Sequence, residues 1–591
     1  MSTKINRLFD FAYYQLENHN LEKAFVSKSS GEWVVTSTKE FIEKINTVSR
    51  GLLRLGVKPN DKIAVISSAN RTEWNILDMA ILQLGAQNVP IYPTIGINDY
   101  KYIFNHAEVT FCFLSDEGLF EKANAIKDEV ATLQEIYSFE NIKGCKNWQE
   151  VFDLGADESN QKEVEKLKAN VKSSDLATII YTSGTTGVPK GVMLSHNNIV
   201  TNVLDSYPRL PIIPGKSKVI SFLPVCHVFE RMLHYLYIHS GLTIYFAESI
   251  EKISDNLKEV KPNFMSVVPR LLEKIYDSII AKGAELTGVK KRLFFWAVDL
   301  GLDYKPYGAN GWLYEKKLAL ANKLIFSKWR EALGGELQTM VSGSAALQPR
   351  LTRVFAAAGM QVMEGYGLTE TSPVATVNMY ADKHFKVGSV GKPINNVEIK
   401  IADDGEILIK GPNVMLGYYK DPEKTAEVMT GDYFHSGDKG ELDKEGFLKI
   451  TGRKKEIFKT SGGKYISPAL LENEMKQSRF IEQILVIGEG QKMAAAIVQP
   501  NFTFVKEWAK RHEINIGSTF EEIVTTKEVK QRIEEEITHG NKNFGKWETI
   551  KCFELTPEEW TVDNELLTPT FKPKREVILT KYKHLYDKIY C

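Results

Sequence analysis

Strand-like and helix-like segments alternate along the N-terminal part of the chain, and this alternation limits the fold more than any other feature. Short apolar runs typical of buried strands occupy residues 62–67, 88–92 and 109–114. Segments with the helical spacing of apolar residues occupy 41–55 and 73–84. Strands that are joined by helices pair in parallel, with the helices on the faces of the sheet. We therefore expect an α/β fold.

The length of 591 residues exceeds what one hydrophobic core can fill, so we expect more than one domain. The 75 basic and 75 acidic side chains give a net charge of zero, which argues against nucleic acid as a partner. The five cysteines are scattered without metal-ligand spacing, which favours a reducing, cytoplasmic location. We expect neither a secretory signal nor a transmembrane helix, because no sufficiently long apolar stretch is present.

Residues 176–196 give the clearest indication of a binding site. Its apolar start predicts a strand, and six consecutive Thr, Ser or Gly residues follow, from Thr182 to Gly187. Such a loop offers backbone N–H groups and hydroxyls without bulk, which suits the oxygens of a polyphosphate. Lys190 adds a positive charge at the far end. The spacing differs from the common G-x-x-x-x-G-K-[ST] phosphate loop, so a flexible turn without function is the alternative.

A second group of motifs lies between residues 340 and 371. A strand-like run leads into the small residues 343–346, where a backbone can approach a flat ring closely. The order Met-Glu-Gly-Tyr-Gly-Leu-Thr-Glu-Thr then brings an aromatic ring, hydroxyls and a carboxylate together at 363–371. Tyr366 offers a ring on which a purine can stack, and Glu370 offers a ligand for the Mg²⁺ that accompanies ATP.

Three further candidates follow from single residues and their surroundings. His227 lies in the motif Ser221–Arg231 and is a candidate site residue. The alternative is a buried histidine whose hydrogen bonds are purely structural. An acidic side chain such as Asp438 suits the two ribose hydroxyls of a nucleotide, and an arginine such as Arg453 can strengthen that contact. The alternative is a Gly-Asp turn without a function. Lys572 lies in a basic loop near the C-terminus. Lys574 is two residues away, and a loop without function remains the alternative there.

Taken in order, these motifs resemble those of the adenylate-forming enzymes, the superfamily of acyl-CoA synthetases, firefly luciferase and peptide-synthetase adenylation domains. The resemblance spans residues 30–585 and includes at least six motifs in the family's order. The runs His227-Val-Phe-Glu-Arg231 and Thr570-Phe-Lys572 are most similar to the long-chain fatty acyl-CoA synthetases.

The resemblance implies a large N-terminal domain, residues 1–454, and a small mobile α+β C-terminal domain, residues 455–591. The large domain would hold two α/β subdomains and a small β-rich subdomain. Lys455 falls at the family's hinge position. A swing about this residue would withdraw Lys572 and bring residues 461–463 to the channel for the pantetheine arm of CoA.

The resemblance also implies roles for individual residues. The implied catalytic residues are Lys572, Glu370, His227 and Thr185, and the implied Mg²⁺ ligands are Thr185 and Glu370. The positions implied to contact ATP or CoA, with the hinge Lys455, are Thr182, Ser183, Gly184, Thr185, Thr186, Gly187, Lys190, Gly343, Ser344, Ala345, Glu364, Gly365, Tyr366, Gly367, Thr369, Asp438, Arg453, Ser461, Gly462 and Gly463.

The implied activity is the ATP-dependent conversion of a long-chain fatty acid to acyl-AMP, with pyrophosphate release, and transfer of the acyl group to CoA. A carboxylate that approaches the α-phosphate meets another anion. At about 4 Å the two repel by about 4 kcal/mol at an effective dielectric constant of about 20, and a lysine between them cancels this repulsion. The sequence shows no Ser-His-Asp order or G-x-S-x-G elbow that would supply a protein nucleophile.

Two alternatives to this activity remain open. The first is an adenylate-forming ligase for a medium-chain or aryl acid, or one that passes the acyl group to a carrier protein. The second is a non-catalytic acyl or nucleotide sensor. A sensor is expected to lack one or more of the charged candidate site residues, but all of them are present. These are Lys190, Glu370, Asp438, Arg453 and Lys572.

Two segments leave membrane contact open. Residues 1–20 have the spacing of an amphipathic helix, which either packs on its own domain or rests on a membrane. Residues 281–333 are basic and aromatic, typical of either a solvated helical face or a patch that attracts anionic lipid. We expect fatty acid, ATP and CoA as partners, a monomer or homodimer, and a cytoplasmic location with contact to the cytosolic face of a membrane as the open alternative.

Overall fold

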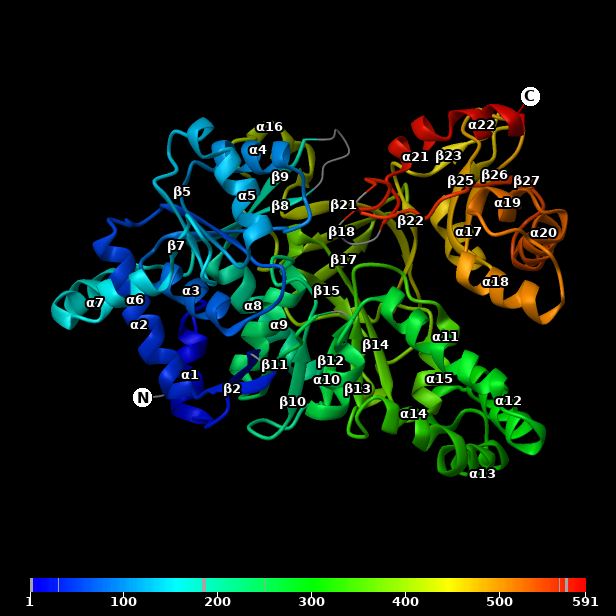
Figure 1. Ribbon diagram of the computed structural model, residues 1–591, viewed down its shortest axis with the longest axis horizontal. Helices are drawn as coiled ribbons and strands as arrows, with labels where there is room; N and C mark the ends of the chain where they lie inside the picture. The colour runs from blue at the N-terminus through cyan, green and yellow to red at the C-terminus, as the bar shows by residue number, and fades with distance from the viewer. Residues whose placement is uncertain are drawn as a thin grey trace. The chain divides into compact units, whose positions relative to one another are not determined.

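The computed structural model of the chain contains two compact units (Figure 1). The large unit comprises Met1–Lys400 and Leu408–His435, and the small unit comprises Ile401–Ile407 and Ser436–Cys591. The residues that the structure describes are 4–29, 31–182, 188–249, 251–562, 564–568 and 572–590.

An eight-stranded sheet forms one half of the large unit, in the order β19-β9-β8-β4-β3-β5-β6-β7. Its strands are β3 (Lys62–Ile66), β4 (Gln87–Ile91), β5 (Val109–Leu114), β6 (Glu135–Ser138), β7 (Lys146–Asn147), β8 (Leu176–Thr182), β9 (Lys190–Ser195) and β19 (Gly417–Tyr418). Neighbours from β8 to β7 pair in parallel, whereas β9 and β19 add an antiparallel edge. The predicted parallel sheet is therefore confirmed.

Helices cover both faces of this sheet, as the alternating pattern predicts. The helices α2 (Thr38–Arg54) and α3 (Thr72–Gln83) pack on the face that presents Ile63 and Val65. The helices α4 (Ile97–Ala107) and α5 (Glu117–Ala125) pack on the face that presents Ala64 and Ile66. Because side chains alternate along a strand, each face of the buried strand β3 has a core of its own.

A nine-stranded sheet forms the second half of the large unit, in the order β16-β15-β14-β13-β12-β10-β11-β1-β2. Its strands are β1 (Phe25–Ser29), β2 (Glu32–Thr36), β10 (Lys218–Ser221), β11 (Thr243–Phe246), β12 (Phe264–Val267), β13 (Thr339–Ser342), β14 (Gln361–Gly367), β15 (Val374–Val377) and β16 (Lys392–Pro393). Strands β14 to β1 pair in parallel, so the carboxyl ends of β10, β12, β13 and β14 meet at one edge. The two predicted α/β subdomains correspond to the two sheets.

One helix, α9 (Val228–His239), lies between the two sheets, and all its residues from Val228 to Ile238 are buried. It follows α8 (His196–Ser206), against which it packs. A helix without a face in water carries either apolar side chains or polar ones with partners inside the protein, as Glu230 and Arg231 have.

The N-terminal helix α1 (Asp10–Asn18) also packs on α9. The side chains of Leu8, Phe9, Phe11 and Ala12 are all fully buried in the core of the large unit. The apolar face of this helix is therefore unavailable to a membrane, and packing on its own domain is the correct interpretation.

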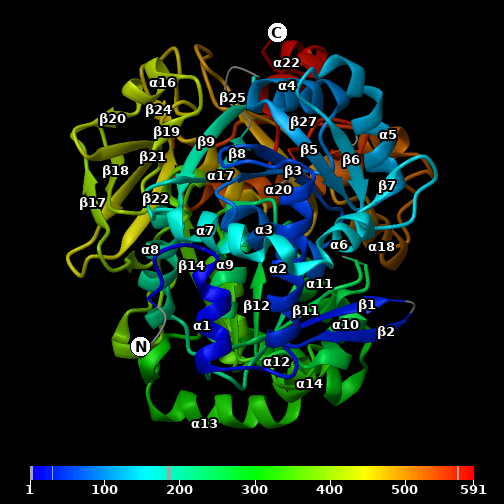
Figure 2. The same cartoon turned by 90° about the vertical axis from the view of Figure 1, so that its left-hand side faces the viewer.

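A group of helices covers the nine-stranded sheet on the side of β10 to β14 (Figures 1 and 2). They are α10 (Ile253–Val260), α11 (Pro269–Glu285), α12 (Gly288–Leu302), α13 (Trp312–Ala321), α14 (Ser327–Ala332) and α15 (Pro349–Ala357), with a π-helical turn at Asn322–Phe326. Trp329 of α14 lies at the centre of their core with Phe294, Phe326 and Phe355 around it. Helix α13 lies at the outer rim of the large unit.

The small unit is an α+β domain, as predicted. Its central sheet has the order β25-β26-β27, with β25 (Ile481–Ile487) antiparallel and β27 (Cys552–Leu555) parallel to β26 (Ala495–Pro500). Its other elements include β22 (Leu448–Arg453), β23 (Phe458–Lys459), β24 (Tyr465–Ile466), α17 (Pro468–Met475), α18 (Phe502–Arg511), α19 (Phe520–Thr525), α20 (Lys527–Asn541), α21 (Arg575–Lys581) and α22 (Lys583–Tyr590).

Short strands occupy the segment between residues 392 and 453, in agreement with the predicted β-rich character. They include β17 (Glu398–Ile401), β18 (Glu406–Lys410), β20 (Met429–Thr430) and β21 (Tyr433–Leu442). The predicted boundary at 454/455 falls within the small unit, in the turn after β22, and stays a prediction. Among the described residues, no helix is both long and apolar enough to cross a bilayer.

Candidate active site

Lys190 begins strand β9 and pairs in register with Thr182, the last residue of β8. The two strands are antiparallel, so the predicted phosphate loop is the connection of a hairpin. Five of the predicted phosphate contacts, Ser183, Gly184, Thr185, Thr186 and Gly187, lie outside the described residues. The hairpin nevertheless places Lys190 beside the end of that loop.

Gly191 allows strand β19 to approach β9 closely. A Cβ atom at this position would lie 2.8 Å from Ile179 Cγ2 and 3.3 Å from Tyr419 Cβ. The Tyr419 N–H donates to the Gly191 carbonyl over 2.7 Å. A larger residue would separate the strands, and the close approach brings Tyr418 next to Lys190.

Tyr418 connects Lys190 with Glu370. Its hydroxyl donates a hydrogen bond of 2.9 Å to Glu370 Oε1, and Lys190 Nζ lies 4.6 Å from the centroid of the tyrosine ring. The backbone closes the same contact, because the Met415 N–H donates to the Glu370 carbonyl over 2.8 Å. Burial and the neighbouring carboxylate raise the pKa of Tyr418, so its phenol stays protonated as a donor.

Sequence reasoning missed Tyr418. It lies 48 residues from Glu370, and no regular spacing links the two. Only the pairing of β19 with β9 brings the tyrosine to this place.

Glu370 fits the predicted Mg²⁺ site. Mg²⁺ binds through one or two carboxylates and takes its other ligands from phosphates and water. The hydrogen bond from Tyr418 orients the Glu370 carboxylate, as outer groups commonly do for metal ligands. The second predicted ligand, Thr185, lies outside the described residues, which contain no cluster of three or more His, Cys, Asp or Glu suited to a metal ion.

The predicted adenine contacts lie on two neighbouring strands. Strand β13 ends at Ser342, which pairs with Glu364 of β14, so the turn 343–345 and the motif 365–367 follow at the same edge. Gly343 is buried, Ala345 is exposed, and Ser344, Gly365, Tyr366, Gly367 and Thr369 are half-buried. The structure therefore brings together the two halves of the adenine site that the sequence predicts.

Glycine is required at position 367. A Cβ atom there would lie 1.7 Å from the Pro373 carbonyl oxygen, so no side chain fits. The Pro373 carbonyl approaches Gly367 because β14 turns back into β15 with a register shift between Tyr366 and Gly367. The backbone at Tyr366, at the edge of the sheet, is therefore held by the pairing of β14 with β15.

Glu364 is buried, with 6% of its surface exposed. Its Oε1 accepts the N–H of Leu347 over 3.1 Å, which ties the turn after β13 to β14. Burial raises the pKa of this carboxyl to about 8. The geometry indicates a positioning residue, and its predicted contact with the nucleotide stays a prediction.

His227 precedes helix α9 and caps it. Its Nδ1 accepts the N–H of Phe229 over 3.1 Å, and its ring lies 6.4 Å from that of Tyr92, edge to face. The side chain is half-buried rather than enclosed. Because Nδ1 accepts, a neutral ring carries its proton on Nε2.

The two residues after Phe229 hold α9 between the sheets. Glu230 accepts hydrogen bonds of 2.6 Å from Ser221 Oγ and 2.7 Å from Ser266 Oγ, both in the nine-stranded sheet. Arg231 donates to Asp78 on α3 and to Thr178 on β8, over 2.6 Å and 2.7 Å. The sequence marked this motif as a subfamily feature but not this role, which polarity within an apolar run could have signalled.

In the small unit, Asp438 of β21 pairs in register with Arg453 of β22. Arg453 Nε donates to Asp438 Oδ1 over 3.0 Å, and only 7% of Asp438 is exposed. The two residues predicted to grip ribose are therefore neighbours, and the position of the carboxylate is set by the guanidinium.

Lys572 lies close enough to this pair to interact with it electrostatically. Shielding from water lowers the pKa of its amine although part of the side chain is exposed, and the charge of Arg453 lowers it further. The carboxylates of Asp438 and Glu456 act in the opposite direction.

Two hydrogen bonds tie Lys572 to Thr568. The Thr568 N–H donates to the Lys572 carbonyl over 2.8 Å, and the Lys572 N–H donates to Thr568 Oγ1 over 3.0 Å. Lys574, the alternative choice, instead adjoins helix α21, and its N–H donates to Leu566. Lys572 is the lysine that interacts electrostatically with Asp438 and Arg453, and its catalytic role stays a prediction.

The remaining predicted positions lie on turns of the small unit. Lys455 is exposed in the turn after β22. Ser461, Gly462 and Gly463 are exposed in the connection between β23 and β24, where Gly463 has a φ of 78°. Their roles as hinge and as CoA channel stay predictions.

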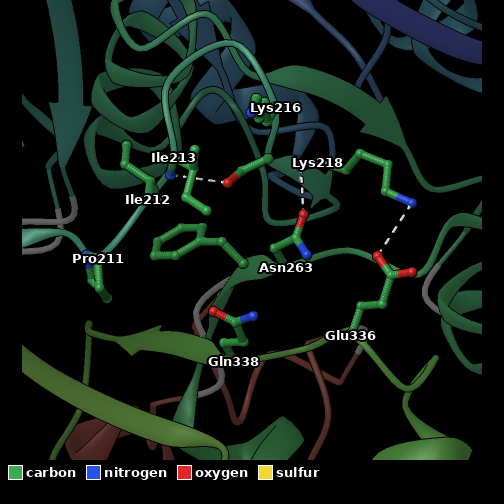
Figure 3. A pocket seen from close by; sticks show the side chains of 10 residues that line it. Pro211, Ile212, Ile213, Lys216, Lys218, Asn263, Glu336 and Gln338 are labelled. Carbon is green, nitrogen blue, oxygen red and sulfur yellow. Dashed lines mark hydrogen bonds and ion pairs between the residues drawn. The ribbon is translucent and has the colours of Figure 1, made fainter.

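A pocket of about 200 Å³ lies at the opposite edge of the nine-stranded sheet (Figure 3). It adjoins Lys218 and Phe264, the first residues of β10 and β12. Lys218 Nζ lies 3.6 Å from Glu336 Oε2 at its wall. None of the predicted site residues lines it, since they follow the carboxyl ends of the strands.

Two family models match most of the chain. Residues 14–419 match the family model of the AMP-binding enzyme, and residues 455–546 match that of the AMP-binding enzyme C-terminal domain. The chain belongs to the AMP-binding enzyme family. The predicted resemblance to adenylate-forming enzymes is thereby confirmed.

Similar proteins include two curated ligases. The long-chain-fatty-acid–CoA ligase FadD15 of Mycobacterium bovis is 33% identical over 564 residues, which cover 95% of this chain and 93% of that protein. The human long-chain-fatty-acid–CoA ligase 1 is 33% identical over 95% of this chain and 82% of its own length.

Similar solved structures share the fold. ATP-bound MatB from Rhodopseudomonas palustris has a TM-score of 0.71 at 21% identity, covering 99% of this chain and 100% of its own. A fatty acyl CoA synthetase of Mycobacterium tuberculosis has a TM-score of 0.65 at 19% identity, covering 98% and 99%.

Proposed function

We propose that the chain is a long-chain fatty acid–CoA ligase that uses ATP and releases pyrophosphate and AMP. The curated relatives that carry this name support the choice of acid, since they match nearly the whole chain at 33% identity. The observation that carries the chemistry is the proximity of Lys572 to the Asp438–Arg453 pair.

In the first half-reaction, a carboxylate oxygen of the fatty acid bonds to the α-phosphorus of ATP. The bond between the α-phosphorus and the bridging oxygen breaks, and pyrophosphate leaves. If Asp438 binds the ribose hydroxyls, the nearby amine of Lys572 stands beside the α-phosphate, between two anions. The lysine then offsets their repulsion, and no covalent bond to the protein is required.

The phosphate groups would occupy the large unit. Lys190 supplies a cation at the hairpin end, and Tyr418 orients the carboxylate of Glu370. Mg²⁺ bound with ATP at Glu370 would neutralise charge on the departing phosphates. Tyr366 at the end of β14 offers its ring to adenine.

In the second half-reaction, the thiolate of CoA attacks the acyl carbon and AMP leaves. Lys572 has no further role once pyrophosphate has gone. We propose that a rotation about Lys455 withdraws this lysine and brings the exposed turn 461–463 to the pantetheine arm. The exposure of Lys455 and its position in a turn after β22 support a hinge at this point.

We propose that the protein is cytoplasmic and contacts the cytosolic face of a membrane. We also propose that it is a monomer or a homodimer. Support for membrane contact comes from exposed basic and apolar side chains within residues 281–333. Sedimentation equilibrium would settle the number of copies.

A pyrophosphate-release assay tests the proposed function. Palmitate should support release without CoA, and CoA addition should convert the bound intermediate to palmitoyl-CoA and AMP. Benzoate, acetate and octanoate should support slower release. A faster reaction with an aryl or medium-chain acid would refute the long-chain assignment, a product formed only with a carrier protein would refute CoA as acceptor, and no release with any acid would refute the enzyme.

A further inference from the structure

Helix α13 exposes an unusual number of apolar side chains. The exposed fractions are 70% for Trp312, 56% for Leu313, 49% for Leu320 and 40% for Leu324, which follows in the π-helical turn. The lysines Lys316, Lys317 and Lys323 are exposed among them. We call these seven side chains the α13 face.

The apolar and basic side chains of the α13 face are ordered. Residues 313, 320 and 324 recur at intervals of seven and four, so the three leucines share one side of the helix. Lys316 and Lys317 fall on opposite flanks of that leucine stripe, at about 100° per residue. Lys316 also lies against the exposed tryptophan, with its Nζ 4.7 Å from the Trp312 ring.

The inner side of α13 is firmly packed. Leu318 and Ala321 are buried in the core of the surrounding helices. The hydroxyl of Tyr314 donates to the Leu300 carbonyl of α12 over 2.6 Å. The leucines of the α13 face therefore point outward from a helix whose other side is packed, at the outer rim of the large unit (Figures 1 and 2).

The charge of the α13 face favours one occupant. Residues 312–324 contain three lysines and one acidic residue, Glu315. Leucine and tryptophan with lysines on the flanks is the composition of a helix that lies in a bilayer interface. The lysines are then at the depth of lipid phosphates, where each contributes to binding of anionic lipid.

We propose that the α13 face binds the surface of an anionic lipid bilayer. This rests on the proposed function, because a long-chain fatty acid partitions into bilayers and an enzyme at that surface meets it at high local concentration. The leucines and Trp312 enter the interface, while the three lysines contact phosphate groups. Contact through α1 is ruled out by the burial of its apolar side chains.

Vesicle cosedimentation without ATP or fatty acid tests this proposal, so that loss of ligase activity does not affect the readout. We expect binding to vesicles of phosphatidylcholine with phosphatidylglycerol and much weaker binding to phosphatidylcholine alone. K316Q/K317Q should lower the partition coefficient about 25-fold, since each lysine near an anionic surface contributes about fivefold. Added salt should reduce the difference between the two proteins.

Two further variants make the test specific. L320S/L324S should lower binding to anionic vesicles with little change in salt dependence. The control K162Q/K166Q removes two exposed lysines from α7 (Gln161–Asn170), which lies well away from α13 in both views, and should bind like the wild type (Figures 1 and 2). Activity on detergent-dispersed palmitate reports whether each variant is folded.

Two outcomes would overturn the proposal. One is equal vesicle binding by the wild type, K316Q/K317Q and L320S/L324S. The other is a wild-type dimer, seen by light scattering, that both variants convert to a monomer without altered vesicle binding. That result would make a second copy of the chain the occupant of the α13 face.

Discussion

The phenol of Tyr418 donates a hydrogen bond to the carboxylate of Glu370 over 2.9 Å, across 48 residues of sequence. The face of the same ring lies 4.6 Å from Lys190 Nζ. One side chain thus joins the lysine of the phosphate hairpin to the carboxylate that fits Mg²⁺. The arrangement makes Tyr418 a positioning residue in the proposed reaction.

The Tyr418→Phe variant tests this relationship. Loss of the donor should leave the Glu370 carboxylate less well oriented and weaken the apparent affinity for Mg²⁺ about 10- to 100-fold. Mg²⁺ titration of pyrophosphate release measures the effect. Tyr419→Phe is the matched control, because that hydroxyl donates to Glu108 at the surface over 3.5 Å rather than to Glu370. Equal Mg²⁺ dependence of both variants would contradict the role.

Removal of the proposed catalytic cation should affect one half-reaction. Lys572→Ala should slow acyl-AMP formation about 10²- to 10³-fold, because it removes one preorganised charge at the α-phosphate. Thioester formation from supplied palmitoyl-AMP and CoA should persist. Lys574→Ala, two residues away, should retain both rates. A larger loss in Lys574→Ala would show that the assignment is wrong by two positions.

The proposed hinge predicts the opposite separation. Lys455→Pro fixes φ at this position and should hinder rotation of the small unit. Pyrophosphate release should stay near the wild-type rate while transfer to CoA slows. Single-turnover measurements of each step provide the readout. Equal loss in both steps would speak against a hinge at this residue.

The buried carboxyl of Glu364 predicts a pH dependence of stability. Its folded-state pKa of about 8 lies above the ordinary value of 4.5, so the folded protein binds the proton more tightly. Between these two values the free energy of unfolding should fall with rising pH by up to about 1.4 kcal/mol per pH unit. Above pH 8 the folded protein carries the full destabilisation from the ionised carboxyl, and below pH 4.5 it carries none.

Glu364→Gln should remove this contribution, because the amide oxygen can still accept the Leu347 N–H. Urea unfolding of both proteins at several values between pH 5 and pH 8 provides the comparison. The variant should gain stability relative to the wild type as the pH rises. Parallel profiles would show that Glu364 is ionised in the folded protein.

The ion pair of Arg231 and Asp78 predicts a large loss of stability. Both side chains are almost fully buried, and their closest N–O distance is 2.6 Å. Arg231→Met should destabilise the large unit by about 3–5 kcal/mol, because the buried carboxylate of Asp78 loses its cationic partner and keeps only the neutral donors Asn88 and Tyr235 among the described residues. Asp78→Asn in the same background should recover part of this loss, and urea unfolding of the single and double variants measures the coupling.

Fold class and family could both be predicted from the amino-acid sequence, which also named the residues of the candidate site. Apolar periodicity predicted β3, β4, β5 and the helices between them, because local pattern decides which residues face a core. The resemblance of the motifs predicted the family, which the comparisons confirm. It also named Asp438 and Arg453 as a pair, and the two are neighbours on β21 and β22, while their contact with ribose stays a prediction.

Contacts between residues far apart in the chain could not be read from the sequence. The antiparallel edge β9–β19 brought Tyr418 to Glu370, and the enclosure of α9 gave Glu230 and Arg231 their partners. The tertiary structure also decided that the apolar side chains of α1 are buried while leucines of α13 are exposed. The reason is physical: local pattern sets the preference of a segment, whereas the order of strands in a sheet and the packing of its faces determine which distant segments meet.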